Sequence, residues 1–201
     1  MDDFQDFPKM ARLMRPVILT EKLDGTNAQV CIGEDGSIRA GSRTRWITPA
    51  DDNFGFAAWV EANRDELLTL GPGRHFGEWW GRGIQRNYGL TERRFSLFNV
   101  SRWALHGTAP RTMPTGDPRI VRVQDVLPEC CGLVPVLAEL ATFDSVMIDA
   151  HLGALRMSGS HAAPGYSYPE GIVVFHVAGN VGFKRTLEGD DVPKALLKGQ
   201  R

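Results

Sequence analysis

Alternation of hydrophobic and polar residues predicts several β-strands, beginning near the N-terminus. In the segment 27–32, Ala28, Val30 and Ile32 alternate with Gln29 and Cys31, which is the two-residue period of a strand with one buried face. The residues Glu-Asp-Gly at 34–36 follow and are typical of a hairpin turn. The strands predicted in this way are Val17–Lys22, Asn27–Ile32, Ser37–Gly41, His75–Gly81, Phe95–Val100, Arg119–Val123, Ile172–Val177 and Val181–Lys184.

Other segments repeat their hydrophobic residues with a helical period. Phe56, Trp59, Val60 and Leu67 recur at spacings that bring them to one face of a helix, and acidic residues stand before them at 51 and 52. Helices are predicted over residues 51–70, Leu133–Leu140, Phe143–Met157 and Val192–Leu197.

Strands joined by short turns and interrupted by a few helices predict an α+β fold, mainly antiparallel sheets flanked by helices. The 201 residues contain no internal repeat and no low-complexity linker. We therefore expect one domain over residues 1–201.

Composition narrows the function classes. Hydrophobic residues make up 42% and charged residues 23% of the chain, the net charge is −1 and the pI is about 6.5. These values are ordinary for a globular protein and show no overall basic field. Cys31, Cys130 and Cys131 fit neither a disulfide framework nor a zinc site. With neither a membrane-length apolar run nor a secretory signal in the sequence, we expect a cytoplasmic protein.

Charged residues stand at or beside the ends of the predicted strands. They are Lys22 with Asp24, Glu78, Glu170 and Lys184. Charges beside apolar strands are costly unless they are paired or used. Two lysines and two acids suit a phosphate-bearing substrate with a divalent metal, whereas Lys22 in a solvated surface turn is the simpler alternative.

Six segments, taken in order, make a site for a phosphate-bearing substrate the more specific interpretation. The residues Glu-Lys-Leu-Asp-Gly-Thr-Asn at 21–27 resemble motif I of the covalent nucleotidyltransferase superfamily of ATP-dependent ligases and mRNA capping enzymes. The RNA ligase 2-like family is the best match, and Gly-Ile-Gln-Arg-Asn at 83–87 resembles a run found in these ligases. Motifs Ia, III, IIIa, IV and V are matched by residues 42–44, 76–78, 95–100, 170–174 and 183–184.

The resemblance implies a nucleotidyltransferase (ATP-grasp-like ligase adenylation) domain and assigns roles to its residues. Lys22 would become covalently nucleotidylated, Lys184 would meet the α-phosphate, and Glu170 would work with the metal, so these three are the candidate catalytic residues. The nucleotide-binding residues would be Glu21, Asp24, Gly25, Asn27, Arg43, Glu78, Phe98 and Lys184.

Some of these residues have simpler explanations. Asp24 and Asn27 are natural turn formers beside Gly25, and Phe98 could serve sheet packing alone. Arg82 and Arg86 lie in a glycine-flanked loop, where they are candidates for gripping RNA phosphates or solvated loop charges.

The activity implied is that of an ATP-dependent RNA ligase acting in RNA repair, with ATP and Mg²⁺ (or Mn²⁺) as cofactors. Such an enzyme forms lysyl-AMP, passes AMP to a 5′-phosphate end and seals that end to a 3′-hydroxyl. Its partners would be RNA ends, including those at a nick in a duplex. The resemblance ends near residue 186, so we expect no OB or C-terminal appended domain, and a partner protein could supply nucleic-acid binding.

Two positions depart from the family pattern. Thr186 stands where motif V usually has a second lysine, and Phe175 where motif IV often ends in lysine. Both departures remove positive charge. A DNA ligase, a capping-type guanylyltransferase and a non-catalytic nucleotide- or RNA-binding module remain alternatives.

Overall fold

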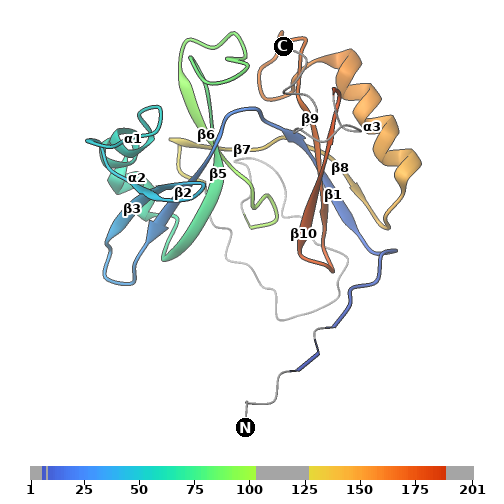
Figure 1. Ribbon diagram of the computed structural model, residues 1–201, viewed down its shortest axis with the longest axis horizontal. Coiled ribbons are helices and arrows are strands. Elements are labelled where there is room, and N and C mark those ends of the chain that lie inside the picture. Colours follow the sequence, from blue (N-terminus) through green and yellow to red (C-terminus); the bar gives the residue numbers. More distant parts are fainter. Residues whose placement is uncertain (1–5, 8, 103–126, 189–201) are drawn as a thin grey trace, which may run out of the picture. The chain divides into compact units, whose positions relative to one another are not determined.

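The computed structural model describes residues 6–7, 9–102 and 127–188. The predicted strand Arg119–Val123 and helix Val192–Leu197 lie outside these residues. The chain divides into two compact units, one formed by Met1–Lys22 with Pro135–Arg201 and the other by Leu23–Val134. Figure 1 shows the elements of both, and each unit is described by itself.

The first unit is a four-stranded antiparallel sheet with one helix against it. Its strand order is β10-β9-β1-β8, where β1 is Val17–Lys22, β8 Val136–Leu140, β9 Gly171–His176 and β10 Val181–Thr186. Helix α3, Ser145–Ser158, lies along this sheet (Figure 1). The Asp144 carboxylate caps it by accepting hydrogen bonds from the backbone N–H groups of Val146 and Met147.

Alternation within these strands assigns one sheet face to the core. The residues that pack together there are Val17 and Leu19 of β1, Ile172 and Val174 of β9, and Ile148 and Leu155 of α3. The intervening residues of β1 and β9 therefore face the opposite side of the sheet.

The second unit is a six-stranded sheet with the order β4-β3-β2-β5-β6-β7. All neighbours are antiparallel except β6 and β7. The strands are β2 Thr26–Ile32, β3 Ile38–Ser42, β4 Trp46–Ile47, β5 Gly73–Gly81, β6 Arg93–Leu97 and β7 Cys131–Leu133, and the helices are α1 Phe56–Ala62 and α2 Arg64–Leu68.

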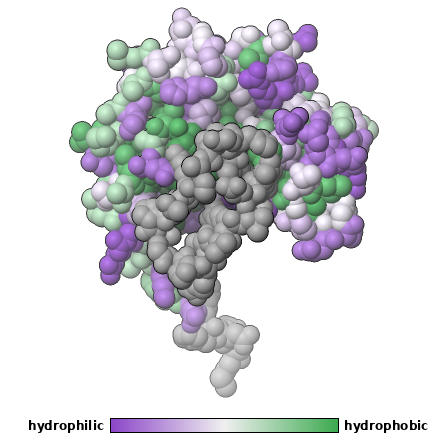
Figure 2. Space-filling model, turned by 180° about the vertical axis from the view of Figure 1, so that it is seen from behind, coloured by the Kyte–Doolittle hydropathy of each residue, from purple (hydrophilic) through white to green (hydrophobic). Residues whose placement is uncertain are grey.

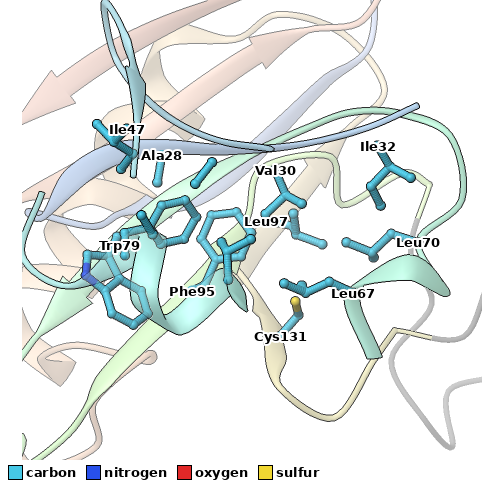
Figure 3. Close-up of a cluster of buried hydrophobic side chains, with 14 of the residues drawn as sticks. Ala28, Val30, Ile32, Ile47, Leu67, Leu70, Trp79, Phe95, Leu97 and Cys131 are labelled. Carbon is cyan, nitrogen blue, oxygen red and sulfur yellow. The ribbon is translucent and has the colours of Figure 1, made fainter. Parts of the chain in front are cut away.

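The core of the second unit lies between one face of this sheet and the two helices. Figure 3 shows Val30 and Ile32 of β2 on the side of Leu67 and Leu70, and Ala28 in the same cluster near Ile47 and Trp79. Aromatic rings fill the same core, and the centroids of Phe56 in α1 and Phe95 in β6 lie 5.0 Å apart. This arrangement leaves the other face of β2, β3 and β5 for polar residues.

The α+β class and its mainly antiparallel sheets are confirmed, but the helix predicted over Leu133–Leu140 is wrong. This segment contributes to β7 and β8, which pair with β6 and β1. Pro135 stands between the two strands, lacks the N–H that a helix needs and disfavours helical geometry at Val134. The spacing of the hydrophobic residues around Pro135 resembles a helical period, but pairing with β1 and β6 makes the segment two strands.

The single helix predicted over residues 51–70 is also wrong in its extent. Helix α1 begins at Phe56 and ends before Asn63, whose φ of −110° separates it from α2. The Asp52 carboxylate accepts hydrogen bonds from the N–H groups of Ala57 (2.8 Å) and Ala58 (3.0 Å). Asp52 therefore satisfies the start of α1 from outside the helix.

Phe98 does not lie in a strand, as the prediction of Phe95–Val100 had it, because β6 ends at Leu97. In the described part of the chain no helix is long and apolar enough to cross a bilayer. Figure 2 shows hydrophilic and hydrophobic residues intermingled over the described surface of one face.

Candidate active site

Lys22 is the last residue of β1, and its amine pairs with the carboxylate of Glu170, just before the neighbouring strand β9. The Nζ atom of Lys22 contacts Oε2 of Glu170, which directly precedes β9. Both side chains are partly exposed, and Lys22 pairs with Gly171 in the sheet. The pair therefore stands at one end of two adjacent strands in the first unit.

Gly171 explains why Glu170 can stand there. Its φ is 155°, and a Cβ at this position would lie 2.2 Å from the carbonyl oxygen of Arg185 in β10. A side chain would force β10 away from β9. The glycine after Glu170 thus keeps the strands close where the lysine and the glutamate meet.

Lys184 lies on the same face of the sheet as Lys22. The register joins Lys22 to Gly171 and Thr186, and Thr20 to Val173 and Lys184, so the two lysines stand two residues apart along the strands and two strands apart across the sheet. Thr186, the departure from the usual motif V, occupies the position directly in line with Lys22.

Arg185 points away from that face. Its Nη2 donates to Oδ1 of Asp149 in α3 at 2.8 Å, on the helix side of the sheet. The alternation of a strand places Arg185 and Lys184 on opposite faces. Arg185 therefore does not replace the missing lysine charge beside Lys22.

Glu21 also faces the helix side, and it is 1% exposed. Its carboxylate accepts hydrogen bonds from Ser160 Oγ at 2.5 Å and from the N–H groups of His161 (2.8 Å) and Ala162 (3.0 Å). Both oxygens are engaged by the protein. Glu21 holds the 160–162 loop to β1, and its predicted contact with the nucleotide stays a prediction.

In the second unit, Glu78 holds the turn that begins just after Lys22 in the chain. Its Oε1 accepts a hydrogen bond from the N–H of Gly25 (3.0 Å) and its Oε2 from Nδ2 of Asn27 (3.2 Å). Gly25 packs so closely on β5 that a Cβ there would lie 2.4 Å from the carbonyl oxygen of Trp79. The glycine of the turn is required by packing.

The loop between β5 and β6 holds Asp24 from the other side. Arg86 Nε lies 3.0 Å from Oδ2 of Asp24, and the Asp24 N–H donates to Oη of Tyr88 at 2.8 Å. Gln85, Asn87 and Tyr88 all have positive φ angles. Backbone geometry of this kind persists where the surroundings over-determine it. Arg86 positions Asp24, and its predicted contact with RNA stays a prediction, as does that of the exposed Arg82.

A cavity of about 260 Å³ opens on the polar face of this sheet. Phe76 and Phe98, 51% and 42% exposed, stand side by side, since the Phe98 N–H donates to the Phe76 carbonyl at 3.0 Å. The complete lining is Asn27, Ala28, Gln29, Ser42, Arg43, Phe76 and Phe98. An exposed aromatic pair beside an arginine suits a planar base that carries phosphates.

Two comparisons with known proteins bear on this arrangement. A family model described as RNA ligase matches residues 15–187. The chain belongs to the RNA ligase family. The match spans both compact units, so all the charged residues at the strand ends lie inside it.

Solved structures of Naegleria gruberi RNA ligase mutants share the fold. One, described as apo, is 21% identical with a TM-score of 0.55, and the match covers 92% of this chain and 52% of that one. Another, with ATP and Mn, is 20% identical with the same TM-score and covers 92% and 51%. A third, with AMP and Mn, is 20% identical with a TM-score of 0.56 and covers 94% and 52%. This chain spans about half the length of these ligases.

The carboxylate that contacts Lys22, that of Glu170, suits a divalent metal. No group of three or more His, Cys, Asp and Glu side chains gathers among the residues described here. Mg²⁺ commonly binds through one or two carboxylates together with substrate phosphates. Glu170 fits that mode, in which the metal arrives with a nucleotide.

Phe76, Gln29 and Ser42 were not predicted as site residues, although all three line the cavity. For Phe76 the sequence held a signal, because it stands two residues before Glu78 on the same strand and alternation places both on one face. Gln29 and Ser42 are ordinary polar residues of strands, and only the pairing of β2 with β3 and β5 brings them beside Phe76.

Proposed function

We propose that this protein is an ATP-dependent RNA ligase whose nucleophile is Lys22. The observation that carries the proposal is the contact of Lys22 Nζ with Glu170, on the sheet face that also carries Lys184. An amine among charged groups at a rigid strand end has the setting that covalent catalysis by lysine requires. RNA ligase family membership supplies the reaction class.

The reaction proceeds in three displacements. The neutral Lys22 amine attacks the α-phosphorus of ATP, a P–N bond forms, the bond to pyrophosphate breaks, and Nζ loses a proton to solvent. A 5′-phosphate oxygen of RNA then displaces Lys22 and receives AMP. A 3′-hydroxyl finally attacks that 5′-phosphate, loses its proton and releases AMP as the strand is sealed.

The residues of the first unit act on the phosphates. An ammonium paired with a carboxylate is not a nucleophile, so Lys22 has to leave Glu170 and lose its proton before it attacks. Lys184 contributes positive charge toward the α-phosphate. Glu170 would hold Mg²⁺ or Mn²⁺, which would offset the charge of the departing pyrophosphate.

The residues of the second unit bind the nucleoside. Phe98, with Phe76 beside it, stacks on the base, and Arg43 at the cavity wall meets the phosphates. Glu78 contacts the ribose while it keeps the 24–27 turn in place. Asp24 and Gly25 form the turn before β2, Asn27 lies at the start of β2, and together they keep the backbone close to the nucleotide.

The RNA substrate is the finer part of the proposal. RNA with 5′-phosphate and 3′-hydroxyl ends, nicked or single-stranded, is the proposed substrate, and RNA repair in the cytoplasm the proposed setting. We also propose that residues 1–201 act as one adenylation domain, with a partner protein adding nucleic-acid binding.

Intact-mass measurement after incubation with ATP and Mg²⁺ tests the first step. We expect a covalent AMP on the wild-type protein and none on Lys22→Ala, and we expect Glu170→Gln to slow adduct formation by at least about 100-fold. A wild-type protein that stays unmodified with both ATP and GTP would contradict the enzyme proposal.

A second measurement ranks the substrates. An adduct with GTP alone would favour a capping-type guanylyltransferase. If the AMP adduct forms, supplying nicked RNA, nicked DNA and single strands with 5′-phosphates separates the ligase alternatives, and we expect sealing of RNA. Sealing of DNA alone would make the protein a DNA ligase.

A further inference from the structure

We infer that the polar face of the second unit's sheet carries a binding site for single-stranded RNA, formed by Arg39, Trp46 and Arg74. The inference rests on the proposed function, because it says where the RNA that the ligase would join is bound. That place is a surface beside the nucleotide cavity. We call these three residues the arginine–tryptophan row.

Strand pairing brings the two arginines into line across the sheet. Cys31 in β2 pairs with Arg39 in β3 on one side and with Arg74 in β5 on the other. Both arginines are exposed. The neighbouring residues Ala40 and His75 are buried, so the arginines stand on the face opposite the helices and the core.

Trp46 lies against both guanidinium groups. The Cζ atom of Arg39 is 4.0 Å and that of Arg74 5.5 Å from a Trp46 ring centroid. Trp46 pairs with Gly41, and a Cβ on that glycine would come within 2.8 Å of the Gln29 side chain. The absent side chain leaves room for the indole and the Gln29 amide on the same face.

The row is continuous with the cavity. Gln29 Oε1 accepts a hydrogen bond from Arg74 Nη1 at 3.4 Å, and Gln29 pairs with Phe76, which lines the cavity. One exposed face therefore leads from Phe98 and Arg43 through Phe76 and Gln29 to the row.

Charge on this face favours a polyanion. Arg39, Arg43 and Arg74 are exposed cations on it, and Arg94 of β6, on the same face, pairs with Glu92. The carboxylate of Glu78 is 7% exposed and accepts hydrogen bonds from Gly25 and Asn27. Arg45, which is nearby, already pairs with Asp51.

Shape favours a single strand over a duplex. Trp46 is 36% exposed, and aromatic rings beside arginines stack on unpaired bases while guanidinium groups meet the phosphates. A base inside a duplex offers no free face to such a platform.

Fluorescence anisotropy with a short single-stranded RNA that ends in a 5′-hydroxyl tests the site, because this RNA binds without being ligated. We expect Trp46→Ala to raise the Kd at least about fivefold, whereas Trp46→Phe stays close to wild type. Arg39→Ala should raise the Kd and reduce the slope of log K against log salt by about one. Arg156→Ala removes an exposed arginine from α3 and is the matched control, with less than about a twofold effect.

Lysyl-AMP formation is measured on the same variants and separates the two proposals. We expect its rate to stay at the wild-type value in all of them, since it needs no RNA. If Trp46→Ala and Arg39→Ala change the Kd no more than Arg156→Ala, the site is wrong even though the adduct forms. An increase in the ATP requirement without a change in RNA binding would also overturn it. If no adduct forms in any protein but Trp46→Ala still weakens RNA binding, the ligase proposal fails and the RNA site stands.

Discussion

Each of the two units contains a buried glutamate, and the two are held in different ways. Glu21, 1% exposed, receives its hydrogen bonds from Ser160 and the backbone of the 160–162 loop. Glu78, 7% exposed, receives them from Gly25 in the turn after Lys22 and from Asn27 in β2. One carboxylate joins a distant loop to a strand, whereas the other shapes the turn of the candidate site itself.

The difference separates structural from functional use of the same side chain. The resemblance to nucleotidyltransferase motifs was the common signal for Glu21 and Glu78, but the donors around each carboxylate decide what it can do. A carboxylate that anchors a loop distant in the chain from Lys22, as Glu21 does, contributes stability. A carboxylate that holds the turn after Lys22 in the chain contributes to stability and, on the proposed function, to the affinity for ATP.

The largest effect on stability is expected for Glu21→Ala. It leaves the hydroxyl of Ser160 and two backbone N–H groups without their acceptor, which should lower the free energy of unfolding by about 3 kcal/mol. Chemical denaturation measures this change, and the corresponding fall in Tm is about 6 to 12 °C. Glu61→Ala, at an exposed position of α1, is the control and should change it by less than about 0.5 kcal/mol. If Glu21→Ala lowers the affinity for nucleotide and leaves the free energy of unfolding unchanged, the structural role of Glu21 is refuted.

Glu78→Ala tests the other side of the comparison. Without its carboxylate the Gly25 N–H and the Asn27 amide lose an acceptor, and the turn that bears them loses its anchor to β5. We expect the ATP concentration for half-maximal lysyl-AMP formation to rise about tenfold, with a loss of about 1 to 2 kcal/mol in stability. Glu78→Gln keeps one acceptor oxygen and should be intermediate. An unchanged ATP requirement in Glu78→Ala would place Glu78 with Glu21 as a structural residue.

Arg86 and Arg82 form a matched pair in one loop. Arg86 lies 3.0 Å from Asp24, so Arg86→Ala should slow lysyl-AMP formation by about threefold to fivefold, the equivalent of roughly 0.6 to 1 kcal/mol. Arg82→Ala should leave that rate unchanged. The rate is measured by quenched-flow or manual sampling without RNA. Equal rates in both variants would show that the ion pair with Asp24 does not position the turn.

The smallest effect concerns pH and involves His75, whose side chain is buried on the core side of β5. Burial of the ring lowers the pKa of His75, nearby Arg102 adds to the lowering, and the hydrogen bond to the Gly71 carbonyl opposes it. Because the unfolded chain then binds more protons, stability is complete above about pH 6.5 and falls as the pH drops below it.

The slope from this one group is at most about 1.4 kcal/mol per pH unit. Urea denaturation of the wild type and of His75→Gln on both sides of about pH 6.5 measures it. The variant should show the flatter dependence. Identical slopes in the two proteins would show that His75 does not contribute.

Much of the fold followed from local pattern. The limits of β1 agree with the predicted Val17–Lys22, and α3 begins after Asp144 and buries Ile148 and Leu155, as its helical period predicted. Strand alternation likewise placed Arg185 and Lys184 on opposite faces, and the ion pair of Arg185 with Asp149 agrees with it. Periodicity determines which side of an element is buried, so one sequence suffices for such predictions.

Pairing between distant segments was decided by the tertiary structure alone. Leu133–Leu140 has hydrophobic residues that fit either a helix or a strand, and only the partners β6 and β1 select strands. The sequence by itself determined the order of the motifs and the nucleophile candidate Lys22. It could not show that Glu21 holds the 160–162 loop, that Arg86 holds Asp24 or that Phe76 lines a cavity. Each of these depends on which groups, up to 141 residues apart in the chain, the fold places within hydrogen-bonding or contact distance.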